Sequence, residues 1–172
     1  MEKTVRKNTV FQGKILSLRV DDALSEKGTP CKREIVEHSG GVCVLPVQNG
    51  KMLLVRQYRY AYGEYTYEIP AGKREAEEEP LLCGKRELQE ETGFTAEEWV
   101  SFGSIYPSPG YTNEIIYIYL AKGLTAGETH FDEDECIDTL WVSKAQAIEM
   151  IQSGEITDAK TVIAILRYIA GV

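Results

Sequence analysis

One segment, the predicted helix over residues 80–92, constrains this chain more than any other. A proline opens it, and Gly93 behind it is a natural helix stop. On a wheel of about 100° per residue, Glu90 and Glu91 fall within roughly 60° of Glu87, so three carboxylates share one side. Like charges at these spacings destabilise a helix. The pattern indicates either a solvated acidic surface or a site for hard cations such as Mg²⁺, which prefer carboxylate oxygens.

The spacing around this helix is more specific than its charge. Residues 72–94 match the pattern G-x5-E-x7-R-E-U-x-E-E-x-G-U, in which U is a bulky apolar residue. Leu88 and Phe94 fill the two apolar positions. The fixed identities are Gly72, Glu78, Arg86, Glu87, Glu90, Glu91 and Gly93. The chain therefore resembles the Nudix hydrolase superfamily, in which this loop–helix–loop binds the divalent metals that hold a pyrophosphate. Phe94 departs slightly from the family pattern, which usually has an aliphatic residue there.

This resemblance implies a role for each polar residue of the box. The expected metal ligands are the Ala71 carbonyl, Glu87 and Glu91. Mg²⁺ is the expected ion, with Mn²⁺ as an alternative. Arg86 is expected to orient the glutamates through charge-assisted hydrogen bonds, and Glu90 to act beside the ligands in catalysis. Glu78 either ligates through water or anchors the loop, and the two glycines serve backbone geometry.

Segments that flank the box narrow the expected substrate. Residues 68–72 lead into it, and residues 108–114 follow it, with Pro109 sixteen positions past Gly93. Both are similar to the ADP-ribose pyrophosphatase branch in its bacterial form, where a proline at this spacing is a recognised mark. The similarity continues in residues 32–35, 132–137 and 158–161. It implies hydrolysis of ADP-ribose to AMP and ribose 5-phosphate by attack of water.

Two alternatives stay open at this point. The same fold acts on other nucleoside diphosphate derivatives, such as nucleotide sugars or dinucleoside polyphosphates. A non-catalytic module that senses ADP-ribose or metal is the second alternative, although sensing does not need the full glutamate set.

Further site residues follow from the same resemblance. In the resembling enzymes a glutamate from the loop after the box positions or activates the attacking water. Glu133 is the first choice here, and Glu135 is either the alternative base or a metal ligand; a solvated turn is the competing interpretation. The expected substrate-binding residues are Arg33, Glu34, Arg59 and Glu114. The two arginines suit this role because guanidinium groups pair with diphosphate oxygens in a two-pronged fashion. The competing interpretations are exposed strand arginines and, for Glu114, a structural role at the start of a strand.

Local patterns predict an α+β domain, a layered α/β/α sandwich rather than a doubly wound parallel sheet. Asn49-Gly50 is a strong hairpin signal between two apolar segments. The expected strands are residues 4–11, 15–20, 33–38, 41–47, 51–57, 66–69, 99–106, 114–121 and 136–142. The expected later helices are residues 143–151, which Ser143 caps, and 158–169. Residues 1–172 are expected to form one Nudix domain, with its core over 39–172 and an N-terminal antiparallel β segment over 1–38. By analogy that segment helps to build the partner's site in a homodimer.

Composition excludes several other classes. The net charge of −8 disfavours a nucleic-acid-binding surface. Apolar runs fall short of the roughly 18 residues that span a bilayer, and the N-terminus lacks a secretory pattern, so a cytoplasmic protein without membrane contact is expected. The four cysteines are far apart and predict neither a zinc site nor a disulfide framework.

Overall fold

The computed structural model describes residues 1–129 and 137–171. They divide into two compact units: residues 1–40 with 106–115, and the described residues of 41–105 and 116–172. The first unit is an antiparallel sheet, as predicted for the N-terminal segment. Its strands are β1 (Lys3–Arg6), β2 (Thr9–Gln12), β3 (Leu16–Leu24) and β4 (Pro30–His38). Strand β3 is central, with β4 along one edge and β1 and β2 in succession along the other.

The prediction of one continuous strand over residues 4–11 is wrong. Asn8 lies between β1 and β2 and bonds to the central strand in place of regular pairing. Its side chain donates to the Val20 carbonyl at 3.1 Å, and its own carbonyl accepts from the Val20 N–H at 2.8 Å. An asparagine that satisfies the backbone in this way interrupts a strand.

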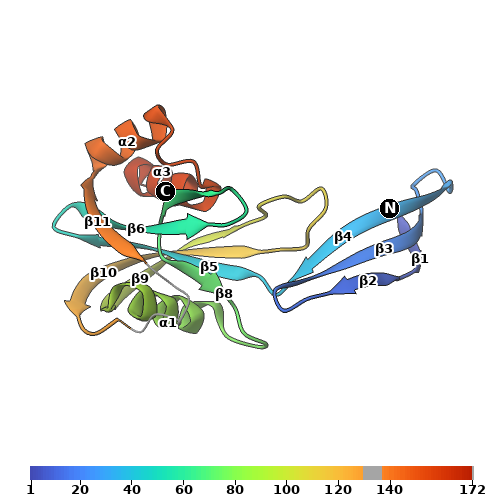
Figure 1. Ribbon diagram of the computed structural model, residues 1–172, viewed down its shortest axis with the longest axis horizontal. Coiled ribbons are helices and arrows are strands. Elements are labelled where there is room, and N and C mark those ends of the chain that lie inside the picture. Colours follow the sequence, from blue (N-terminus) through green and yellow to red (C-terminus); the bar gives the residue numbers. More distant parts are fainter. Residues whose placement is uncertain (130–136, 172) are drawn as a thin grey trace. The chain divides into compact units, whose positions relative to one another are not determined.

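The second unit is built on a mixed sheet (Figure 1). Its strands run in the order β11-β6-β5-β10-β9, while β7 pairs with β6 and β8 pairs with β5. Strands β5 and β10 are parallel, and the other neighbours are antiparallel. The strands are β5 (Gly41–Gln48), β6 (Lys51–Arg59), β7 (Glu64–Glu68), β8 (Ala71–Lys73), β9 (Phe94–Ile105), β10 (Ile116–Ala126) and β11 (Asp138–Ser143). The predicted hairpin is confirmed, because Asn49 and Gly50 both take positive φ, 51° and 74°.

In the part of the chain that the structure describes, three helices cover this sheet, with α1 (Pro80–Thr92) on one face and α2 (Lys144–Ser153) and α3 (Ala159–Ala170) on the other (Figure 1). Alternation along β5 explains the layers, since successive side chains of a strand point to opposite faces. Cys43 and Leu45 pack in the core with Ile165 of α3, whereas Val44 packs with Leu88 of α1. The predicted α/β/α sandwich is confirmed.

Local signals set the helix ends. Gly93 stops α1 with a left-handed φ of 72° and donates its N–H to the Gln89 carbonyl, as predicted. Ser143 caps α2 in a reciprocal capping box with Gln146. Across the described ranges, none of the helices is both long and apolar enough to cross a bilayer.

Candidate active site

Arg86 holds the charged face of α1 together. Its Nη1 lies 2.7 Å from Glu87 Oε1 and 2.8 Å from Glu90 Oε2, so it bridges two carboxylates of the helix. The Nε and Nη2 atoms contact the two oxygens of Glu78 at 3.0 and 3.1 Å. These hydrogen bonds from Arg86 lower the pKa of Glu78 to about 2, and they raise the pKa of Arg86. Glu78 therefore anchors the loop before the helix through the guanidinium.

The carboxylates of Glu87 and Glu91 lie against the short strand β8. Glu91 is 4% exposed, and its Oε2 accepts the Ala71 N–H at 3.2 Å. The carboxylate of Glu87 lies against Gly72, where a Cβ atom would stand 1.9 Å from its Cδ. Two carboxylates one helical turn apart therefore converge on the backbone of residues 71–72. A glycine is needed at position 72 because a Cβ atom would collide with this carboxylate. Its backbone conformation is not the reason, since Gly72 is not among the glycines with positive φ.

These groups suit a magnesium ion in kind and number. Carboxylate and carbonyl oxygens are hard donors, and Mg²⁺ is usually held by one or two carboxylates together with water and substrate phosphates. Within residues 1–129 and 137–171, no group of three His, Cys, Asp or Glu side chains could hold a metal without other ligands. An open site completed by water or by substrate oxygens fits Glu87, Glu91 and the Ala71 carbonyl better than a closed protein cage does.

A second charged network lies just before the box. Glu68 is 3% exposed and accepts from Arg59 Nε at 2.6 Å and Nη2 at 2.7 Å. It also pairs with Lys160 of α3 at 2.5 Å. Burial alone would raise the pKa of Glu68, but the bonds and charges of Arg59 and Lys160 outweigh it and lower that pKa to about 2. The hydrogen bond to Glu68 raises the pKa of Arg59, and the charge of Glu91 adds a smaller contribution in the same direction, so this arginine lies within electrostatic reach of the box.

Sequence reasoning missed Glu68 and Lys160 as members of the site region. The available signal was a charged residue directly before the apolar Ile69, at the end of a segment predicted to be a strand. A buried charge is costly unless it is paired, so such a position predicts a partner without identifying it.

Glu68→Gln is expected to change how stability depends on pH. In the wild-type protein the folded-state pKa of Glu68, about 2, lies below the value in the unfolded chain. The charged carboxylate therefore stabilises the fold above about pH 4.3, and this contribution is lost as the pH falls toward 2. The variant should be less stable than wild type by up to about 3 kcal/mol at pH 7, with a smaller difference at pH 2.5. Urea unfolding at both pH values measures this; a difference independent of pH would contradict the assignment.

The remaining predicted site residues fall into two groups. Arg33, Glu34 and Glu114 belong to the first unit. Arg33 pairs there with Glu2, and Glu114 lies 3.4 Å from His38 Nδ1. Glu133 and Glu135 fall outside the described residues, so their predicted role in water activation stays a prediction.

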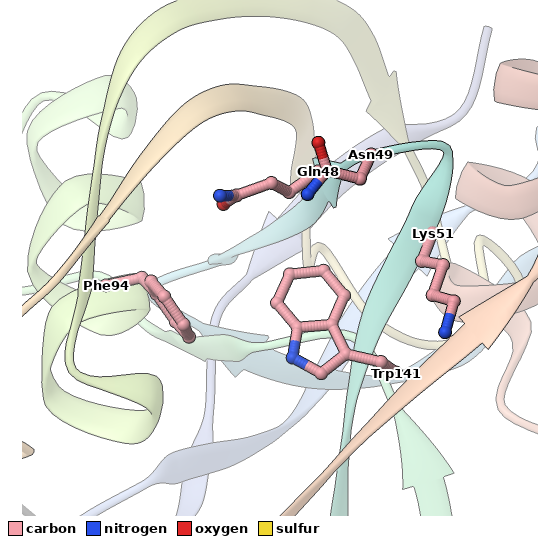
Figure 2. A pocket seen from close by; sticks show the side chains of 5 residues that line it. All are labelled: Gln48, Asn49, Lys51, Phe94 and Trp141. Carbon is pink, nitrogen blue, oxygen red and sulfur yellow. The ribbon is translucent and has the colours of Figure 1, made fainter.

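Phe94, the aromatic residue at the last position of the box, lines a hollow at the end of the β5–β6 hairpin (Figure 2). The Phe94 ring meets Trp141 edge to face, with centroids 5.9 Å apart and an interplanar angle of 81°. In this view the indole lies between Phe94 and Lys51 (Figure 2). The hollow is lined by Gln48, Asn49, Lys51, Phe94 and Trp141. Its lining among residues 1–129 and 137–171 includes no carboxylate and does not include the groups at β8.

The fold and the box geometry agree with comparison to known proteins. The NUDIX domain matches residues 37–164, and the chain belongs to this family. It is 42% identical to the ADP-ribose pyrophosphatase of Bacillus subtilis (strain 168), over 95% of this chain and 90% of that protein. It is 41% identical to the methanol dehydrogenase activator of Bacillus methanolicus, over the same shares. The GDP-mannose pyrophosphatase of Enterobacter sp. (strain 638) is 34% identical over 80% of this chain and 77% of its own length. A crystal structure of an ADP compounds hydrolase shares the fold, with a TM-score of 0.87, 20% identity, and coverage of 99% and 95%.

Proposed function

We propose that this protein hydrolyses the diphosphate of ADP-ribose to AMP and ribose 5-phosphate by attack of water, with Mg²⁺ as cofactor and Mn²⁺ as a substitute. The observation that carries the proposal is the convergence of Glu87 and Glu91 on the backbone of residues 71–72. The similarity to an ADP-ribose pyrophosphatase over 95% of the chain supports the choice of substrate.

Each group of the site has a distinct task in this proposal. Glu87, Glu91 and the Ala71 carbonyl would hold the metal, which when bound would offset the diphosphate charge and lower the pKa of water. Arg86 keeps Glu87 and Glu90 in place through its bridging contacts. Glu133 is the proposed base for the attacking water, with Glu135 as the alternative.

Arg59 is the proposed diphosphate contact of the second unit. Its Nε and Nη2 atoms bind Glu68 side by side, which fixes the plane of the guanidinium. The side chain is 39% exposed, so part of it is accessible to an anion. A planar, fixed guanidinium recognises phosphate oxygens with little loss of entropy.

The proposal also covers the first unit, the oligomeric state and the location of the protein. Arg33, Glu34 and Glu114 contact substrate, and the segment over residues 1–38 takes part in a homodimer around a core of residues 39–172. The net charge of −8 supports a protein that acts on a small molecule rather than on nucleic acid or a membrane. A cytoplasmic location agrees with nucleotide chemistry.

The test is turnover of a substrate panel by the purified protein. ADP-ribose with Mg²⁺ should yield AMP and ribose 5-phosphate, and excess EDTA should reduce the rate at least about 100-fold, since metal charge stabilisation contributes several kcal/mol. Added Mg²⁺ should restore it. The panel should include GDP-mannose, because a relative at 34% identity is a GDP-mannose pyrophosphatase, and a dinucleoside polyphosphate.

The panel separates the alternatives. Faster cleavage of GDP-mannose would keep the chemistry and replace the substrate. Binding of ADP-ribose without turnover of any panel member would overturn the enzymatic proposal in favour of a sensor.

A further inference from the structure

A buried polar network at the start of α3 lies behind the segment that leads into the box. Asp158 caps the helix, and its Oδ2 accepts from the Thr161 N–H at 3.0 Å and from the Thr161 hydroxyl at 2.6 Å. Lys160 joins the cap by bonding Asp158 Oδ1 at 2.9 Å and Glu68 Oε2 at 2.5 Å. Thr161 is completely buried, and Lys160 is 14% exposed. The helix start is therefore fixed internally and is joined to the end of β7.

The four residues 68–71 are held through contacts to four other elements, β5, β6, α1 and α3. Glu68 is paired with Lys160 and Arg59. The Ile69 N–H donates to Thr161 Oγ1 at 2.9 Å, across 92 positions of sequence. The remaining two contacts lead to the sheet and to the box: the Pro70 carbonyl accepts from the Val44 N–H at 2.9 Å, and the Ala71 N–H donates to Glu91 Oε2 at 3.2 Å.

Through these hydrogen bonds the start of α3 restrains the backbone that leads to Ala71 and Gly72. Ala71 and Gly72 must lie close against Glu91 and Glu87, with no room for a displaced strand. Strand β8 has three residues and pairs only along β5 within the described sheet, so its position also depends on the contacts of the residues that lead into it. The Thr161 hydroxyl acts both as a hydrogen-bond donor, to Asp158 Oδ2, and as an acceptor, from the Ile69 N–H. A side chain without this acceptor leaves a buried N–H without a partner.

We propose that Thr161 and Lys160 are positioning residues for the reaction. They fix residues 68–71 and thereby set the Ala71 backbone and the Arg59 guanidinium relative to the box glutamates. The inference rests on the proposed function as a metal-dependent hydrolase. Neither residue touches the reacting atoms, so each acts through Glu68, Ile69 and Ala71.

The test compares Thr161→Val, which keeps the shape of the side chain and removes the hydroxyl, with Thr161→Ser, which keeps the hydroxyl. Mn²⁺ affinity is measured by electron paramagnetic resonance on metal-free protein without substrate. The valine variant should bind Mn²⁺ about tenfold more weakly, because groups that orient metal ligands typically change affinity 10- to 100-fold. It should also need more Mg²⁺ for half-maximal hydrolysis of ADP-ribose. The serine variant should stay within about threefold of wild type.

A matched control separates positioning from stability. Ile165→Val removes a methylene from a completely buried residue of the same helix, away from the polar network. It should lower Tm and leave Mn²⁺ affinity unchanged. If Thr161→Val does not fold, Lys160→Met provides the same comparison, because it removes the bonds to Glu68 and Asp158.

The outcomes distinguish failure of the positioning role from failure of the proposed hydrolase function. A valine variant with lowered Tm and wild-type Mn²⁺ affinity would overturn positioning and leave the proposed function intact. Wild-type protein that binds no Mn²⁺ and hydrolyses no ADP-ribose would overturn the proposed function, and the positioning role with it.

Discussion

Glu91→Gln should reduce kcat for ADP-ribose by about 10²- to 10³-fold, the scale seen when one transition-state-stabilising group is removed. Glu91 is 4% exposed and is one of the two carboxylates that meet the β8 backbone. An amide has one oxygen and no charge, so it is a poorer ligand for a hard cation. The variant keeps the shape of the side chain and an acceptor for the Ala71 N–H. The fold should therefore persist while metal binding weakens.

Rates across a Mg²⁺ titration, together with Tm, measure this prediction. Glu98→Gln is the matched control, since Glu98 is an exposed glutamate of β9 outside the box. It should keep kcat within about threefold, because surface substitutions of this kind have small effects. If Glu91→Gln retained near-wild-type kcat at low Mg²⁺, Glu91 would not be a metal ligand.

Much of the box region was predictable because its signals are local. The proline that opens α1, the stop at Gly93 and the spacing of the glutamates are all contained within residues 72–94. The Asn49-Gly50 hairpin and the Ser143 cap are equally local, and both were confirmed. Helix ends and tight turns depend on backbone groups a few positions apart, so sequence is sufficient for them.

Contacts between distant segments were not predictable in the same way. Glu68 and Lys160 are 92 positions apart, and the parallel pairing of β10 with β5 joins residues 116–121 to 41–46. Such pairings depend on the folded arrangement of the sheet rather than on local propensity. The start of β9 at Phe94, well before the predicted residue 99, has the same origin. It extends along β10, where Phe94 pairs with Ala126.

Gly72 illustrates the difference between identifying a residue and explaining it. The sequence predicts a glycine needed for backbone geometry, which usually means a positive φ. The positive-φ glycines of the structure do not include Gly72, and the requirement is instead the space taken by the Glu87 carboxylate. This reason is visible only when α1 and β8 are placed side by side.

Gly72→Ala is therefore expected to abolish most activity with little loss of stability. The added Cβ would lie 1.9 Å from Cδ and Oε1 of Glu87 and 2.2 Å from its Oε2, so one of the two groups must move. A carboxylate at the end of a flexible side chain moves more readily than a paired strand, so we expect Glu87 to rotate away. The displaced carboxylate no longer faces the metal position, and kcat should fall about 10²-fold or more, since small misplacements of catalytic groups have effects of this size.

Steady-state kinetics and thermal unfolding of the same preparation measure this pair of effects. Gly84→Ala is the control, because its methyl group would meet Val42 and Val44 on the apolar side of α1, at 3.1 and 3.3 Å. That variant should keep kcat within about threefold whatever its Tm, since it leaves the carboxylates in place. A Gly72→Ala protein that unfolds at a much lower temperature would show that β8, rather than Glu87, gives way. Wild-type kcat in that variant would remove Glu87 from the metal site, because its carboxylate cannot stay where it is beside an alanine.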